Sequence, residues 1–457
     1  RSSSAFVPSL ATAKFTTRGI STSYTKGPAS HTRRTRHKMS DKAFANQSKS
    51  GEIPSYDGDE KAKATDFANY FCSYAQLYHQ KQMLVDHNRM ASYHQAIMGN
   101  AEMFKDKVVM DVGTGSGILA VWAALAGAKK VYAIEYTDMA KHARQVVEAN
   151  GVSDIVTVIQ GAVEDIKLPI AEDGLEAEED GGTLVVDIMV SEWMGYFLLR
   201  ESMLDSVIRA RDKYLKKKTG LMFPSHCTMY VAPVIDEDDR KQSVHEYSHT
   251  MDDWSEFVDS TRSLYGVDMS VLGKDFDREQ KEYYLLSSRW AELGATQLLA
   301  EPKAVKAYDM STCTLEDSRG IAHGEEMATF DFDIDADSTD DECVSGIAGW
   351  FTSDFKSRTD EGGADAPKIN PAFLSTGPDA GYTHWGQQVM HFQSKIPLLQ
   401  GETTRLQGSV ELMRTKENAR LYNCRLRFSN SRRKTGEAKD GNLLMQGPNV
   451  EHVYQIP

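Results

Sequence analysis

The sequence predicts an α/β domain followed by a β-rich domain. Two patterns and the length of the chain lead to this prediction. Residues 108–135 have the pattern of a strand, a glycine turn, a helix and a second strand, which is a βαβ unit. After Pro224, short β-type segments alternate with turn residues, as in a barrel or sandwich. A chain of 457 residues is long enough for two or three domains with cores of their own.

Charge is distributed unevenly along the chain. Residues 1–38 carry eight Lys or Arg and no acid, so they contribute +8 to the net charge of −14, and residues 39–457 carry −22. An acidic body of this kind disfavours direct binding to nucleic acid and favours basic partners. Acidity that serves solubility alone is the simpler alternative.

Cysteine usage and hydropathy exclude other classes. The five cysteines are scattered without a CxxC pair, so we expect a reducing compartment, with neither a disulfide framework nor a metal site. The longest apolar run, residues 118–128, is too short to span a bilayer. We therefore expect a soluble protein without a membrane partner.

Residues 1–60 lack hydrophobic periodicity and are rich in Ser, Thr, Arg and Gly, which predicts a disordered N-terminal extension. Residues 1–38 have the composition of an organelle transit peptide. Met39, however, resembles an ordinary start, so we expect the cytoplasm and nucleus, with an organelle as the alternative. Imaging fluorophore fusions of the full chain and of a Met39-start version separates the two; identical diffuse distributions exclude the organelle.

Residues 66–100 place apolar and aromatic side chains three and four positions apart, which predicts one or two amphipathic helices. Helices that merely pack on the sheet are the alternative to a functional role. Next comes the βαβ unit, in which residues 113–117 form the glycine turn and a helix runs through Ala126. Its glycines allow a tight turn and the close approach of a ligand. Glu135, at the end of the second strand, is placed to accept a hydrogen bond from a ribose diol.

The turn does not match the dinucleotide-binding pattern, because Ile118 stands where the third glycine would be. A βα turn without any ligand remains the alternative. A helix over residues 138–150 and a strand over 155–160 follow, and Glu164 then places a carboxylate where it suits an adenine amino group. Residues 171–182 hold six acids and three glycines, which predicts a flexible surface insertion.

Residues 184–190 form an apolar run that predicts a strand buried on both faces. Glu192 follows it, and Glu201 stands near the start of a helix predicted over residues 202–214. A strand that turns back into a helix brings both glutamates to one pocket at the carboxyl edge of the sheet. Two carboxylates among aromatic residues suit a guanidinium, which offers five donors in a fixed fork. The alternative is that one glutamate is solvated in a loop and the charge of the other is stabilised by the dipole at a helix N-terminus.

The second half is predicted to be mainly β-structure. Its expected strands cover residues 226–233, 328–334, 343–355, 386–392, 404–415 and 420–428. Residues 236–299 are largely helical in pattern and too long for a connection, so they predict a protruding arm. A polar loop over residues 358–378 leads into Thr383, His384 and Trp385.

Four separated motifs give the chain a family resemblance. They are residues 70–74 (YFCSY), 111–117 (DVGTGSG), 191–196 (SEWMGY) with Glu201, and 383–385 (THW). The second is similar to the first motif of methyltransferases that use S-adenosyl-L-methionine (AdoMet), and the other three are specific to one family. With them the chain resembles the type I protein arginine N-methyltransferases, most closely the plant-type branch.

The resemblance, which begins near Asp66, implies an overall architecture. Residues 61–222 are expected to form an AdoMet-binding Rossmann-like domain with N-terminal helices. Residues 223–457 are expected to form a β-barrel substrate domain. Within it, the arm over residues 236–299 is implied to make a homodimer by docking on the AdoMet domain of a second subunit.

The resemblance also implies a cofactor-binding set, which comprises Tyr70, Gln80, Met83, Arg89, Gly113, Glu135 and Glu164. Arg89 is implied to hold the AdoMet carboxylate, Glu135 the ribose and Glu164 the adenine, with Gly113 behind the methionine. Many family members have histidine where this chain has Gln80, whose amide is still able to hydrogen-bond the cofactor.

Four residues are implied to be catalytic: Glu192, Glu201, His384 and Asp86. The two glutamates would hold the substrate guanidinium, while the histidine and aspartate would form a dyad beside it. The implied substrate-binding residues are Tyr74, Met194 and Trp385.

The expected reaction is methyl transfer from AdoMet to arginine in histones and Arg/Gly-rich proteins, giving monomethyl- and asymmetric dimethylarginine. Two other classes stay open at this point. A nucleobase or metabolite methyltransferase is disfavoured by the acidic body and by the lack of an Asn/Asp-Pro-Pro-Tyr/Phe motif. A catalytically silent scaffold is disfavoured by the intact Glu192, Glu201 and His384. A substrate screen with labelled AdoMet separates these classes.

Overall fold

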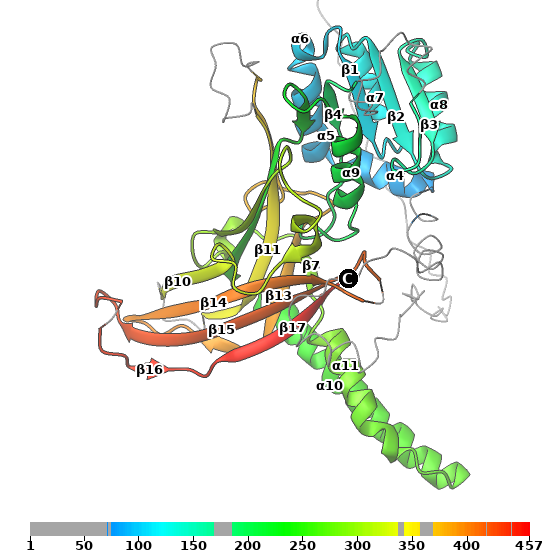
Figure 1. Ribbon diagram of the computed structural model, residues 1–457. Coiled ribbons are helices and arrows are strands. Elements are labelled where there is room, and N and C mark those ends of the chain that lie inside the picture. Colours follow the sequence, from blue (N-terminus) through cyan, green and yellow to red (C-terminus); the bar gives the residue numbers. More distant parts are fainter. Residues whose placement is uncertain are drawn as a thin grey trace, which may run out of the picture.

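The computed structural model describes residues 71, 75–168, 185–336, 342–356, 369–416, 418–439 and 441–457. The predicted N-terminal extension, Tyr70, Tyr74 and the acidic insertion at 171–182 lie outside the described residues. The described chain forms an α/β domain, an antiparallel β-barrel and a helical arm that projects from the barrel (Figure 1).

The α/β domain is built on five parallel strands in the order β3-β2-β1-β4-β5. They are β1 (Val108–Val112), β2 (Lys130–Glu135), β3 (Val156–Gln160), β4 (Ile188–Val190) and β5 (Leu221–Phe223). Every residue of β1 is buried, as expected for a central strand covered on both faces. The strand order changes direction between β1 and β4, and such a switch point is where parallel sheets bind ligands, at the carboxyl ends of their strands.

The helices of this domain follow the predicted pattern. They are α4 (Leu77–Leu84), α5 (His87–Met98), α6 (Ala101–Phe104), α7 (Ile118–Leu125), α8 (Met139–Ala149) and α9 (Leu204–Tyr214). Helix α5 begins where it does because Asp86 caps it: the Oδ1 of Asp86 accepts the backbone N–H of Arg89 at 3.0 Å. Helix α8 buries Met139, Ala143 and Val147, which recur every four residues along one face.

Strand β4 is shorter than the apolar run over residues 184–190 predicts. Asp187 interrupts the run, because its carboxylate accepts the backbone N–H of Val108 at 2.9 Å and pairs with the amine of Lys216 at 2.9 Å. Upstream of it, among the described residues, only an isolated bridge from Val186 extends the pairing. Phe223 is the last residue of β5 and therefore belongs to the parallel sheet.

Two antiparallel sheets form the barrel. The first contains β6 (His226–Val234), β7 (Arg289–Ala291), β8 (Lys303–Asp309), β11 (Cys343–Phe355), β12 (Ala372–Ser375) and β13 (Gln387–Pro397). The second contains β9 (Gly320–Ile321), β10 (Thr329–Asp335), β14 (Glu402–Arg414), β15 (Tyr422–Lys434), β16 (Met445–Gln446) and β17 (Val450–Ile456). Short 3₁₀ turns η3 (Ala295–Gln297) and η4 (Asp317–Arg319) connect strands. Phe392 of β13 stacks on Phe428 of β15 with ring centroids 4.3 Å apart, which joins the two sheets through the core.

The arm consists of α10 (Glu237–Tyr265), η2 (Ser270–Leu272) and α11 (Gly273–Tyr284). The stacked rings of Trp254 and Phe276, with centroids 4.2 Å apart, hold the two long helices together. Figure 1 shows the arm extending from the barrel on the side away from the α/β domain. It is shorter than predicted, because residues 289–291 form β7 and pair with β13. None of the described helices is both long and apolar enough to traverse a bilayer.

Candidate active site

The glycine turn after β1 forms one edge of the candidate site. Gly113, Gly115 and Gly117 have φ angles of 74°, 53° and 86°, a region that side chains with a Cβ rarely adopt. A Cβ on Gly113 would collide with the end of the Met203 side chain, which reaches over the turn from the residue before α9. The turn therefore needs glycine for its backbone conformation, whereas the end of the flexible Met203 side chain is able to move aside.

Glu135 is fixed at the end of β2 beside this turn. Its Oε2 accepts the N–H of Gly115 at 2.9 Å, and its Oε1 accepts the N–H and hydroxyl of Thr137 at 2.8 and 2.7 Å. A carboxylate has about four acceptor positions, so three are used and one remains for a ligand hydroxyl. The contact with Thr137 was not predicted; its position two residues after the acid, where a turn returns to the carboxylate, is the only signal for it.

Three other predicted cofactor residues lie around the same edge. Gln80 of α4 is buried, and its Oε1 lies 2.8 Å from where a Cβ on Gly115 would be. The carbonyl of Met83 accepts a hydrogen bond from Arg89 at 3.2 Å. Glu164, exposed in the loop after β3, accepts the hydroxyl of Ser206 at 2.7 Å. Helix α4 thus borders the glycine turn, and the loop after β3 borders α9.

Asp111 is a buried acid at the foot of the turn. Its Oδ2 accepts the hydroxyl of Thr114 at 2.6 Å. Burial raises the pKa of Asp111 to about 7, because the low-dielectric interior disfavours the charged form more than the bond from Thr114 favours it. The site therefore holds a carboxyl group that titrates near neutral pH.

Arg89 and Glu192 form a buried ion pair across the site. The Nε and Nη2 of Arg89 lie 2.8 and 2.7 Å from Oε2 of Glu192, and the two side chains are only 10% and 8% exposed. The other oxygen, Oε1, accepts the N–H of Met194 at 3.2 Å. The structure therefore pairs two residues that were assigned to different ligands, and it ties the first glutamate to α5.

The loop carrying the second glutamate folds back on itself. Gly195 donates its N–H to Leu198 at 2.9 Å, and it packs so tightly on the carbonyl of Arg200 that no larger residue fits. Glu201 and Ser202 then adopt φ angles of 87° and 59°. Such left-handed conformations cost about 1–3 kcal/mol each outside glycine, and they persist only where the surroundings enforce them. The side chain of Glu201 is 15% exposed, and its Oε1 lies 3.3 Å from Nη1 of Arg200.

His384 and Asp86 form the predicted dyad. Asp86 is fully buried, and its Oδ2 accepts both the backbone N–H and the Nδ1–H of His384, at 2.9 and 2.7 Å. Burial raises the pKa of Asp86, but the hydrogen bonds from His384 and Arg89 outweigh it, so this pKa lies below its ordinary value. An ionised Asp86 keeps the proton on Nδ1, which leaves Nε2 of the neutral imidazole as an acceptor.

Trp385 links the dyad to the glutamate loop. Its indole Nε1 donates to the carbonyl of Met194 at 2.8 Å, and the ring is buried. The THW segment of the barrel therefore contacts both α5, through Asp86, and the loop after β4. Tyr70, predicted to bind the cofactor, and Tyr74, predicted to bind the substrate, lie outside the described residues.

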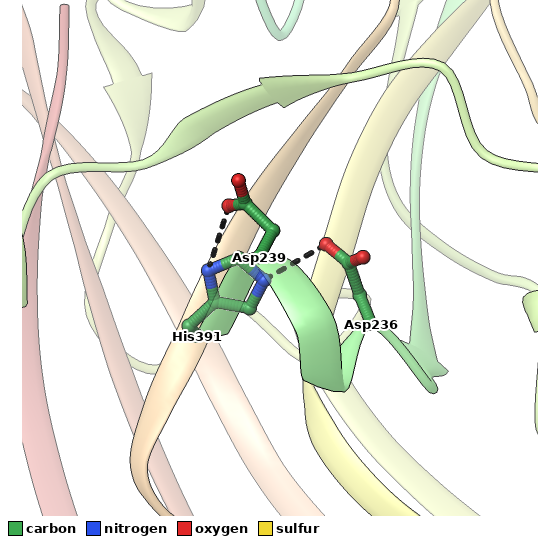
Figure 2. A group of neighbouring side chains, drawn as sticks. All are labelled: Asp236, Asp239 and His391. Atoms are coloured by element: carbon green, nitrogen blue, oxygen red, sulfur yellow. Dashed lines mark hydrogen bonds and ion pairs between the residues drawn. The ribbon is translucent and has the colours of Figure 1, made fainter. Parts of the chain in front are cut away.

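Among the residues that the structure describes, one group resembles a metal site: His391 with Asp236 and Asp239 at the base of the arm (Figure 2). Nε2 of His391 lies 2.9 Å from Asp236 and Nδ1 lies 3.7 Å from Asp239, so the two carboxylates contact opposite edges of the ring. A metal ion needs its ligand atoms to converge on one point. The geometry is that of a histidine held between two carboxylates, which fastens the start of α10 to β13.

A further contact to the site comes from Arg420, in the loop between β14 and β15. Its guanidinium Nη1 donates to the carbonyl of Glu201 at 2.6 Å. The sequence offers no local signal for this contact, because the two residues are 219 positions apart.

Family models and relatives of known name match most of the chain. A family model described as the arginine methyltransferase oligomerization subdomain matches residues 225–433, and one described as ribosomal protein L11 methyltransferase (PrmA) matches residues 97–181. Protein arginine N-methyltransferase PRMT10 of Oryza sativa subsp. japonica is 45% identical over 360 residues, or 79% of this chain and 87% of the relative. PRMT10 of Arabidopsis thaliana is 42% identical over 366 residues, or 80% and 87%.

Two solved structures share the architecture. The crystal structure of Arabidopsis thaliana protein arginine methyltransferase 10 matches with a TM-score of 0.72 and 39% identity, covering 85% of this chain and 100% of that chain. The Trypanosoma brucei PRMT1 enzyme–prozyme heterotetrameric complex with AdoHcy matches with a TM-score of 0.60 and 27% identity, covering 84% and 100%. The chain therefore belongs to the protein arginine N-methyltransferases, whose Rossmann-like domain and β-barrel it shares.

Proposed function

We propose that this arginine methyltransferase takes its methyl group from AdoMet and gives monomethyl- and asymmetric dimethylarginine, the products of a type I enzyme. The observation that carries the proposal is the pair of largely buried glutamates, Glu192 and Glu201, on one folded-back loop beside the glycine turn. The solved T. brucei relative is a complex with AdoHcy, which is what AdoMet becomes after it loses its methyl group.

The residues around the turn fit such a cofactor. Gly113 and Gly115 leave the backbone open to close approach, and Glu135 keeps one acceptor position for a ribose hydroxyl. The guanidinium of Arg89 has five N–H donors. Two bind Glu192, one binds the carbonyl of Met83 and one contacts the sulfur of Met90, which leaves one. The remaining donor suits the cofactor carboxylate. When bound, AdoMet supplies an electrophilic methyl group.

Glu192 and Glu201 are proposed to hold the substrate guanidinium. Arginine is a weak nucleophile, because its lone pairs are delocalised and its pKa lies above about 12. Carboxylates on the outer nitrogens draw positive charge toward themselves and leave the attacking nitrogen richer in electrons. Fixing that nitrogen in line with the methyl group removes roughly 7–11 kcal/mol of barrier when alignment is close.

His384 is proposed to receive the proton that methylation releases. Asp86 keeps the proton of the neutral ring on Nδ1, so Nε2 is the acceptor, and the imidazolium that forms is stabilised by the same carboxylate. The hydrogen bond from Trp385 to the carbonyl of Met194 holds the segment with His384 against the loop that carries the two glutamates. His384 thus acts at the border between the barrel and the Rossmann-like domain.

The substrates are proposed to be basic proteins such as histones and Arg/Gly-rich proteins. The net charge of −22 on residues 39–457 supports this choice, because it attracts cationic segments. The test is incubation with labelled AdoMet and Arg/Gly-rich or histone peptides, followed by mass spectrometry. Asymmetric dimethylarginine is the expected product; symmetric dimethylarginine would overturn the type I assignment, and an absence of methylarginine would overturn the proposed substrates.

A homodimer through the arm is proposed as the working assembly. The tip of the arm carries exposed apolar side chains, with Leu264, Tyr265 and Val271 72%, 76% and 79% exposed. The Rossmann-like domain also exposes apolar side chains in and directly after α4, namely Leu77, Tyr78 and Val85. Apolar side chains exposed at both places favour docking of one on the other. The match of residues 225–433 to an oligomerization subdomain supports the same arrangement.

A further inference from the structure

Both peptide groups of Glu201 are bound by one residue of the barrel. The backbone N–H of Glu201 donates to the carbonyl of Arg420 at 2.8 Å, and the carbonyl of Glu201 accepts a hydrogen bond from Nη1 of Arg420 at 2.6 Å. Arg420 therefore holds the glutamate backbone at two points, once through its own backbone and once through its side chain.

This two-point contact acts on a strained segment. Glu201 and Ser202 both have left-handed φ angles, which residues with a Cβ keep only when neighbouring groups enforce them. Ser202 is held by the same loop, because its hydroxyl donates to the carbonyl of Ala419 and lies 3.2 Å from the hydroxyl of Tyr422. The conformation that aims the Glu201 side chain thus depends on the loop between β14 and β15.

Hydrogen bonds connect the described residues of this loop. Thr415 donates its N–H to the carbonyl of Leu421 at 2.9 Å, and its hydroxyl donates to the carbonyl of Asn418 at 2.7 Å. The side chain of Asn418 in turn accepts the N–H of Arg420 at 2.9 Å. Tyr422, at the start of β15, is fully buried. The backbone of Arg420 is therefore held by Asn418 of the same loop.

The same guanidinium contacts the N-terminal segment. The Cζ of Arg420 lies 4.7 Å from the centre of the Phe71 ring, within the range of a cation–π interaction. The Phe71 ring in turn lies 4.6 Å from the ring of Tyr136, the residue after Glu135. One side chain of the barrel thereby connects the second glutamate to Phe71 and, through its ring, to Tyr136.

We infer that Arg420 is a positioning residue for methyl transfer, which holds Glu201 in its left-handed conformation and ties that conformation to the position of Phe71. The inference rests on the proposed role of Glu201 at the substrate guanidinium. Arg420 does not touch the reacting atoms. It acts on the reaction through the backbone of Glu201.

The test is steady-state and single-turnover methylation of an Arg/Gly-rich peptide by the full chain carrying Arg420→Ala or Arg420→Lys. Arg420→Ala keeps the backbone contact to Glu201 but loses the side-chain contact, so we expect kcat to fall by about 100-fold, the cost of a misplacement of about 1 Å. Calorimetry should give an unchanged Kd for AdoMet. Arg420→Lys retains one donor and should recover part of the lost kcat.

Two further variants separate positioning from folding. Lys416→Ala removes an exposed cation from the same loop and should leave kcat unchanged. Phe71→Leu should lower kcat in the wild-type background but have no additional effect on Arg420→Ala, because the two residues act through one contact. A folded Arg420→Lys with no loss of kcat, or strictly additive effects of Phe71→Leu and Arg420→Ala, would overturn the inference.

The wild-type chain distinguishes this inference from the function on which it rests. If the wild type methylates arginine and Arg420→Ala does so with a kcat within about threefold of it, only the positioning role fails. If the wild type transfers no methyl group to arginine peptides under conditions where it binds AdoMet, the proposed function is wrong, and the positioning role of Arg420 that depends on it is wrong as well.

Discussion

Arg89 of α5 and Glu192 after β4 share one carboxylate oxygen through two hydrogen bonds of 2.8 and 2.7 Å, in a site where neither side chain is more than 10% exposed. The pair joins the N-terminal helices to the carboxyl edge of the sheet. Because Asp86 caps α5 through the N–H of Arg89 and also binds His384, the first glutamate, the arginine and the dyad form one connected network.

Arg89→Lys tests that network. Lysine keeps the charge but lacks the planar fork, so it replaces two hydrogen bonds to Glu192 by one. We expect the free energy of unfolding to fall by about 1–3 kcal/mol, the range for a lost bond to a charged group. AdoMet affinity should fall by about tenfold, measured by calorimetry. Arg144→Lys, on the exposed face of α8, is the matched control, and equal effects of the two substitutions would contradict the assignment.

The buried Asp111 predicts a particular pH dependence of stability. Its pKa of about 7 in the folded protein exceeds the ordinary value of 3.8, so the folded state binds more protons than the unfolded state between these values. The contribution of Asp111 to stability is therefore complete below about pH 4 and is lost as the pH rises to about 7.

Asp111→Asn removes this titration. Urea unfolding at several pH values should show that the wild type loses stability relative to Asp111→Asn as the pH rises from about 4 to about 7, with no further change above it. Asp154→Asn, an exposed acid, serves as the control. A stability difference that stays constant over that interval would show that Asp111 is ionised throughout and would contradict the raised pKa.

The arm predicts concentration-dependent assembly. Val271→Asp places a charge among the exposed apolar side chains at its tip, so analytical ultracentrifugation should change from dimer to monomer. Ser255→Asp adds the same charge to an exposed position elsewhere on α10 and should leave the dimer intact. A Val271→Asp protein that sediments like the wild type would exclude this part of the arm from the interface.

Sequence reasoning recovered the elements that depend on local pattern. The glycine turn after β1 and the amphipathic helices follow from periodicity and backbone freedom, which neighbouring residues determine. The antiparallel strand over residues 343–355 has the bounds that the sequence predicts, because β-branched and aromatic residues such as Val344, Ile347 and Phe351 recur along it.

Elements that depend on distant partners were missed or misplaced. The strand expected over residues 184–190 is shortened because the Asp187 side chain binds Val108, 79 residues away in the chain. The arm is shorter than the sequence predicts, because the pairing of residues 289–291 with β13 leaves no signal in the local sequence. The contact of Arg420 with Glu201 was missed for the same reason. Tertiary partners overrode local pattern in each case.

The measurement that tests the central claim most directly is methyl transfer by Glu201→Gln. Glutamine keeps the size and one acceptor of the side chain but removes the charge that pairs with a guanidinium. With labelled AdoMet and an Arg/Gly-rich peptide, we expect turnover to fall by at least about 100-fold while the Kd for AdoMet stays unchanged. Glu148→Gln, on the surface of α8, should behave as the wild type. Near-normal turnover by Glu201→Gln would contradict the account, because the guanidinium would then be held by other groups.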